Sequence, residues 1–193
     1  MRKLLFLLCL LPLTACVDAD MKLSIEDDTA TVSSVIVMGP DGYQMIAASG
    51  QDLCKDGVGT PLDDGGYRCE IEQTGTIDEV IAELDSAKDN SDGMAPDESA
   101  RIERLDNGDV RVSFDLAEMK AQISEGGIDP AMIAMMQQAF VGRRIKMEIE
   151  GNIIETNGEK AMNGRKAAIT IPLDKLLMQD PSVPDSFVTI VRP

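Results

Sequence analysis

Histidine and tryptophan are both absent from this chain of 193 residues, and aromatic side chains make up only 3% of it. Without histidine, the chain lacks the commonest nitrogen ligand of zinc and the usual general base of catalytic triads. Without many aromatic rings, it lacks the stacking platforms on which proteins bind sugars and bases. These absences count against zinc enzymes, His-based hydrolases and carbohydrate-binding modules.

Basic residues are also scarce, because 18 Lys and Arg stand against 34 Asp and Glu. The formal charge of −16 would be repelled by phosphates, which counts against a nucleic-acid partner. Gly-x-Ser-x-Gly, Ser-x-x-Lys and glycine-rich phosphate-loop motifs are missing. In the one stretch that resembles an EF-hand, Lys88 takes the place of the first calcium ligand. We therefore expect no enzyme, no cofactor and no metal site.

The N-terminus has the pattern of an export signal. Arg2 and Lys3 precede an apolar run, Leu4–Ala15, which is too short to cross a bilayer as a mature helix. The run ends in Leu13-Thr14-Ala15-Cys16, which resembles the lipobox of bacterial lipoproteins. We expect residues 1–15 to be cleaved off as a signal peptide and Cys16 to be acylated. An ordinary signal peptide that ends at the same place without acylation is the alternative.

Acyl chains on Cys16 would hold the protein on a membrane, since each buried CH₂ adds about 0.8 kcal/mol. An anionic lipid surface would repel the acidic domain, so we expect the lipid rather than surface charge to provide attachment. The sequence thus predicts an extracytoplasmic protein, anchored to a bacterial membrane on its periplasmic or cell-surface side. We expect residues 16–20 to be the lipidated N-terminus and tether, and residues 21–193 to form a single domain.

Cys54 and Cys69 are the two cysteines that remain once Cys9 in the signal and Cys16 are set aside. An exported chain meets an oxidising compartment in many bacteria, so we expect them to form a disulfide. Closing a loop of this length contributes about 3 kcal/mol. A redox-active dithiol is the alternative, but no Cys-x-x-Cys motif supports it.

Alternation of apolar and polar residues predicts two β-hairpins. The first covers Met21–Met38 and turns at Asp27-Asp28, and the second covers Arg101–Leu116 and turns at Asn107-Gly108, a pair that favours a type I′ turn. Further strands are expected at Cys69–Gln73, 143–156, 166–171 and Phe187–Val191.

Apolar residues spaced by three and four predict helices between these strands. The clearest follows Thr76-Ile77-Asp78-Glu79, which has the pattern of a capping box. The others are expected at Tyr43–Ala48, Leu116–Ile123, Pro130–Phe140 and Leu173–Met178. A polar segment at 85–99 is expected to be a mobile loop. Together these elements predict an α+β domain, with an antiparallel sheet of hairpins partly covered by amphipathic helices.

These features resemble the LppM-type family of exported bacterial lipoproteins. The likeness rests on the lipobox, the hairpin that follows it, the helical middle and a late segment, 149–158. In the family this segment usually has Pro-Gly, an apolar position and an Asn-Gly turn, which Gly151, Ile153, Asn157 and Gly158 match. The resemblance implies a sheet partly wrapped by helices, similar in shape to lipid-binding modules, and a role in binding lipids or glycolipids. It implies no catalytic residues.

The segment Pro130–Phe140 is unusually rich in methionine, whose side chain adapts to irregular apolar ligands. We expect this helix and the helix before it to line an apolar groove for a lipid or other apolar ligand. The candidate ligand-binding residues are Leu116, Met119, Ile123, Met132, Ile133, Met135, Met136 and Phe140. Packing of both helices on the sheet, with no groove between them, is the alternative.

The sequence therefore predicts a lipid-binding lipoprotein of the cell envelope. A protein-interaction or envelope-assembly module is the alternative, in which the acidic surface and the 85–99 loop meet a basic protein partner. A structural lipoprotein without any ligand also remains open.

Overall fold

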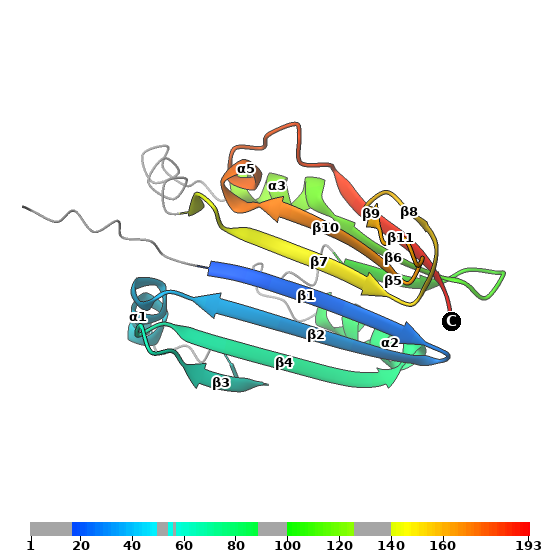
Figure 1. Cartoon of the computed structure of the whole chain (residues 1–193), viewed down its shortest axis with the longest axis horizontal. Coiled ribbons are helices and arrows are strands. Elements are labelled where there is room, and N and C mark those ends of the chain that lie inside the picture. The colour runs from blue at the N-terminus through cyan, green and yellow to red at the C-terminus, as the bar shows by residue number, and fades with distance from the viewer. Residues whose placement is uncertain (1–16, 50–53, 56, 89–99, 126–139) are drawn as a thin grey trace, which may run out of the picture.

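The computed structural model of the chain describes residues 17–49, 54–55, 57–88, 100–125 and 140–193. These residues form two β-sheets and a few short helices (Figure 1). The large sheet has seven strands, in the order β3 (Val58–Pro61), β4 (Tyr67–Thr76), β2 (Thr29–Met38), β1 (Val17–Glu26), β7 (Arg144–Glu150), β10 (Lys166–Pro172) and β9 (Glu159–Lys160). The small sheet has four strands, in the order β5 (Ala100–Arg104), β6 (Val110–Asp115), β11 (Ser186–Arg192) and β8 (Asn152–Thr156). The helices are α1 (Pro40–Ser49), α2 (Ile77–Lys88), α3 (Leu116–Glu125) and α5 (Leu173–Leu177).

The fold is α+β, but it contains two sheets where the sequence predicted one. Most neighbouring strands are antiparallel, as expected, whereas β1 and β7 run parallel in register Leu23↔Ile149. Alternation of residue types shows which face of a strand is apolar, but it does not show which distant strand lies beside it.

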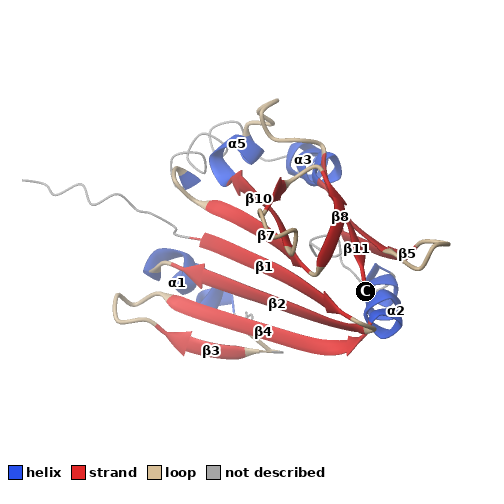
Figure 2. Ribbon diagram, turned by 45° about the vertical axis from the view of Figure 1, so that its right-hand side comes forward, coloured by secondary structure: helices blue, strands red, loops and turns tan. Residues whose placement is uncertain are grey.

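The main core lies between the two sheets. Leu23 of β1 and Ile149 of β7 belong to one buried cluster with Val112 of β6 and Phe187 of β11. The small sheet lies on the side of β7 and β10, away from β3 and β4 (Figure 2). Among the described residues, the small sheet therefore covers only part of the large sheet, and α2 packs on β4 and β2.

The first strand begins at Val17, so residues 17–20 are part of the sheet and do not form the expected tether. Val17 pairs with Met38 of β2, and Asp20 lies between Val35 of β2 and Lys146 of β7. Cys16 and the predicted signal peptide lie outside the described residues. Val17-Asp18-Ala19-Asp20 continues the apolar and polar alternation of β1. Ala19 and Asp20 pair with strands on both sides, which satisfies their backbone groups.

Two expectations about connections also need correction. The segment expected as one strand at 143–156 breaks at Gly151, where the chain leaves the large sheet as β7 and enters the small sheet as β8. Gly151 has φ +149°, which lets the chain turn this corner. The loop expected at 85–99 starts later, because α2 continues to Lys88; residues 89–99 lie outside the described part of the chain.

The capping box at the start of α2 is confirmed. The hydroxyl of Thr76 accepts a hydrogen bond from the Glu79 N–H at 3.2 Å, and the Glu79 carboxylate accepts one from the Thr76 N–H at 2.8 Å. The pKa of Glu79 lies below its ordinary value because the Thr76 backbone and side chain donate hydrogen bonds to its carboxylate. Two N–H groups that the helix itself leaves unpaired are thus satisfied.

We expect Thr76→Ala to lower the free energy of unfolding by about 1 kcal/mol, because it removes the cap. Chemical denaturation monitored by circular dichroism measures this loss. Thr74→Ala, two residues earlier in the same strand, is the control, since the Thr74 hydroxyl bonds only to Thr31 at 3.0 Å on the sheet surface. An equal loss in both variants would contradict the capping role.

Candidate functional site

The large sheet has one apolar face and one charged face. Residues directly opposite each other on paired strands point to the same side, so the strand register assigns each residue to a face. The inner face, which meets the small sheet, carries Ala19, Met21, Leu23 and Ile25 of β1, Ala30, Val32 and Ile36 of β2, Cys69 and Ile71 of β4, Ile145, Met147 and Ile149 of β7, and Ala167, Ile169 and Ile171 of β10. The outer face carries nearly all the charged residues of these strands.

Part of the inner face lies beyond the fully buried core. Met21, Val32, Ile36 and Ile71 are half-buried, and we call these four side chains the apolar strip. Met21 and Val32 pack against the edge of the main core, whereas Ile36 and Ile71 do not belong to it. The strip is aliphatic apart from Ser34, which lies in the row between Met21 and Ile71, and no charged residue of β1, β2 or β4 points to this side. Gly57, in the segment after Cys54, lies against Ile71, so the described chain already covers part of the strip. The rest offers apolar contact without desolvating a charge.

The disulfide lies at one end of the apolar strip. Cys54 and Cys69 are bonded, with Sγ atoms 2.01 Å apart, so this prediction is confirmed. Beside it, the ring of Tyr43 in α1 stacks on Tyr67 of β4, with ring centroids 4.5 Å apart. The space between Ile36, Met38, Tyr67 and Cys69 is only about 10 Å³, so little more than a water molecule would fit there.

The predicted ligand-binding helices are described only in part. Leu116 is 0% exposed and belongs to the main core, so its expected place in the lining of an open groove is wrong. Met119 packs half-buried against that core, and Phe140 is also half-buried. Ile123 lies within α3, and nothing is described of its side chain. The four remaining candidates lie outside the described residues: Met132, Ile133, Met135 and Met136.

The outer face of the large sheet carries a network of ion pairs. Glu148 binds Lys146 and Lys166, each at 2.8 Å, and Glu150 binds Lys22 at 2.7 Å. Burial alone would raise the pKa of Glu148, but hydrogen bonds from the two lysines outweigh it and hold that pKa below its ordinary value. The Lys22 ammonium is the main cause of the lowered pKa of Glu150. This face offers paired charges rather than a site for an apolar ligand.

Because of these lowered pKa values, the stability of the protein depends on pH in the acidic range. Because folding lowers these pKa values below the ordinary value of about 4.3, the stabilisation is complete above that pH and is lost as pH falls through the folded values. We expect Glu148→Gln to cost about 1–3 kcal/mol at neutral pH and to flatten the fall of stability below about pH 4. Urea denaturation across a pH series measures both effects.

A surface pair provides the control for this prediction. Glu103 pairs with Arg111 at 2.9 Å, and both side chains are about half-exposed. Such exposed pairs contribute less than about 1 kcal/mol, so Glu103→Gln should change little. An unchanged acid dependence in Glu148→Gln would show that the network does not govern acid stability.

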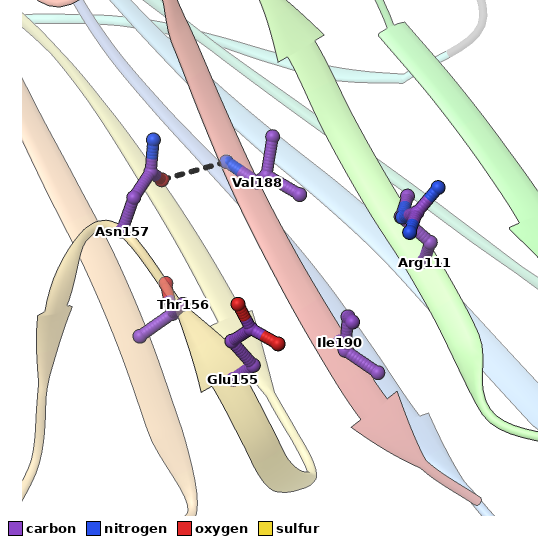
Figure 3. A pocket seen from close by; sticks show the side chains of 6 residues that line it. All are labelled: Arg111, Glu155, Thr156, Asn157, Val188 and Ile190. Carbon is purple, nitrogen blue, oxygen red and sulfur yellow. Dashed lines mark hydrogen bonds between the residues drawn. The ribbon is translucent and has the colours of Figure 1, made fainter.

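The small sheet has a hollow on its outer side, with a volume of about 280 Å³ (Figure 3). It is lined by Arg111, Glu155, Thr156, Asn157, Val188 and Ile190. Two of its polar side chains already have partners: Arg111 pairs with Glu103, and Asn157 Oδ1 accepts a hydrogen bond from the Val188 N–H at 2.8 Å while its Nδ2 donates to Ser186 O. The Asn157 hydrogen bonds hold the end of β8 against β11.

Comparisons with known proteins return nothing: no family model, no curated protein and no solved structure matches this chain. The resemblance to LppM-type lipoproteins therefore stays a prediction from sequence. No helix in the described part of the chain is both long and apolar enough to cross a membrane. Among those same residues, no group of three or more acidic or cysteine side chains is arranged to hold a metal ion.

Proposed function

We propose that this protein is an extracytoplasmic lipoprotein, anchored to a bacterial membrane through acyl chains on Cys16, whose domain binds a lipid along the apolar strip. The observation that carries the ligand proposal is the strip itself. Met21, Val32, Ile36 and Ile71 are half-buried neighbours on one face of the large sheet, at the edge of the main core or beyond it. Their aliphatic side chains fit an acyl chain, and the small number of aromatic residues does not weaken that fit.

The proposed location rests on two further observations. The residues before Cys16 have the order of charged region, apolar run and lipobox that precedes lipidation. The disulfide between Cys54 and Cys69 is of the kind that persists in oxidising compartments outside the cytoplasm. The resemblance to LppM-type lipoproteins agrees with both.

Native mass spectrometry of the exported Cys16→Ser domain tests the ligand proposal, because this variant lacks acyl chains of its own. We expect a lipid adduct that organic extraction removes. Ile36→Asp should lose the adduct, since it places a charge on the apolar strip. Val37→Asp is the matched control: Val37 is the next residue of β2, also half-buried, and points to the outer face. Circular dichroism establishes that both variants are folded.

A bare mass in all samples would overturn lipid binding. The alternative is then an envelope-assembly module, which is favoured by the formal charge of −16. In that case crosslinking in cells should capture one basic envelope protein, and reversing the acidic charges at 85–99 should abolish the capture.

A further inference from the structure

The strand that follows Cys16 leaves no slack between the proposed anchor and the domain. Val17 is already paired with Met38, and the carboxylate of Asp18 accepts hydrogen bonds from the Arg144 N–H and from Arg143 Nη1, each at 3.1 Å. One residue spans at most about 3.6 Å. Acyl chains on Cys16 would therefore hold this end of the large sheet at the membrane surface.

The strand registers define which residues lie at that end. Val17, Met38 and Tyr67 form one row across β1, β2 and β4, and Arg144 lies opposite Pro172 where β7 begins and β10 ends. We call this row and the turns next to it the anchored end. In Figure 1 it is the end where the blue strand begins, and the C-terminus lies at the opposite end of the molecule.

Two exposed apolar side chains lie close to the anchored end. Val141, three residues before β7, is 66% exposed, and Met178, at the C-terminal cap of α5, is 61% exposed. The backbone joins both regions, because the Leu173 N–H at the start of α5 donates to Arg143 O at 2.9 Å. Large aliphatic side chains at this level of exposure gain free energy when they enter a lipid interface.

The acidic residues of the first strand are paired at this end. Asp18 binds Arg143 at 3.1 Å, and Asp20 lies 4.0 Å from Arg144. A protein with a formal charge of −16 would be repelled from an anionic bilayer, but these two arginines offset the acids nearest to Cys16. The exposed Asp63 and Asp64, in the turn before Tyr67, also lie at this end, so acyl chains and apolar side chains rather than charge would hold it at the headgroups.

We infer that the anchored end is a membrane-contact surface, where Val141 and Met178 enter the lipid interface and fix the orientation of the domain. This inference rests on the proposed acylation of Cys16. It does not depend on whether the apolar strip binds a lipid.

A single thiol-reactive probe on the acylated full-length protein in phosphatidylethanolamine–phosphatidylglycerol vesicles tests the inference. The native cysteines leave no competing thiol: Cys9 goes with the signal, Cys16 carries lipid, and Cys54 and Cys69 are bonded. The probe is placed by Val141→Cys or Met178→Cys, and Met162→Cys serves as the control. Met162 is a fully exposed residue in the turn between β9 and β10.

We expect the probe at Val141 or Met178 to lose most of its quenching by aqueous iodide when vesicles are present, with no change at Met162. A ten-residue Gly-Ser spacer inserted before Val17, with a reach of about 17 Å, should restore the quenching. If both probes stay as accessible as the control while mass spectrometry finds acyl chains on Cys16, the inference is overturned and the anchor stands. A mass without acyl chains overturns both.

Discussion

We expect Gly151→Ala to be among the most damaging single substitutions in this protein, with a loss of about 2–5 kcal/mol in the free energy of unfolding. The φ of +149° is strained for any residue with a side chain. A Cβ atom would also lie 2.6 Å from Val191 Cγ1 and 2.8 Å from the backbone oxygen of Ile25. The large sheet contributes Ile25 and the small sheet contributes Val191, so neither can move without disturbing the core. Thermal and urea denaturation measure the loss.

Gly108→Ala is the matched control for this prediction. Gly108 also has a positive φ, +87°, but a Cβ there would meet no atom within 4 Å. The variant carries backbone strain without a clash, and the stiffer unfolded chain offsets part of it, so we expect a loss of about 1 kcal/mol. Similar losses in the two variants would show that the sheet-to-sheet corner tolerates a side chain.

We expect removal of the disulfide by Cys54→Ala together with Cys69→Ala to cost about 3 kcal/mol. The bond joins residues 15 apart and ties the segment before β3 to the inner face of the large sheet. Cys54 and Cys69 are only 7% and 2% exposed. Because of this burial, we expect reducing agents to act slowly on the folded protein and quickly on the unfolded protein.

Denaturation with and without a reducing agent checks the disulfide prediction. The reduced natural protein should lose about as much stability as the double variant, and the double variant should not respond to the reducing agent. Natural protein that keeps its full stability after reduction would show that packing around Tyr43 and Tyr67 is sufficient to hold this region.

Local features could be predicted from the sequence because neighbouring residues determine them. The capping box at Thr76 and the turn at Asp27-Asp28 are examples, and the disulfide follows from having only one pair of cysteines to join. The local sequence did not predict the correct turn type at Asn107-Gly108. Only Gly108 has a positive φ, so the turn is not the expected type I′, which needs a positive φ at both residues. The Asn107 carboxamide instead accepts a hydrogen bond from the Asp109 N–H at 3.0 Å.

Long-range arrangement could not be predicted, because it depends on pairings that leave no local trace. The pattern over 143–156 predicts one strand, because Gly151 alone does not distinguish a bend within a sheet from a change of sheet. Helical spacing likewise predicts that Leu116 lines a groove. That spacing shows that Leu116 lies on the apolar face of α3, but not whether the small sheet seals that face.

The candidate site also combines features that the local sequence shows with features that only the tertiary structure shows. The apolar alternation of β1 and β2 is visible in the sequence, and it predicts strands but not how much of their apolar face is covered. The half-buried strip is apparent only in the structure. There the small sheet packs on the side of β7 and β10, and Ile36 and Ile71 lie outside the main core. The width of one sheet relative to another is a tertiary property, and no single segment encodes it.

The parallel pairing of β1 with β7 also determines the order in which the strands of the large sheet can assemble during folding. The first strand of the chain needs Arg144–Glu150 as its neighbour, and the chain between them contains much of the domain. As the chain emerges N-terminus first, β1 to β4 can assemble early, but the open edge of β1 must wait for residues made near the end. Contacts so distant in sequence slow folding, and an open strand edge attracts other chains in the meantime. A chain that stops before residue 144 would therefore keep an aggregation-prone edge at the middle of its sheet.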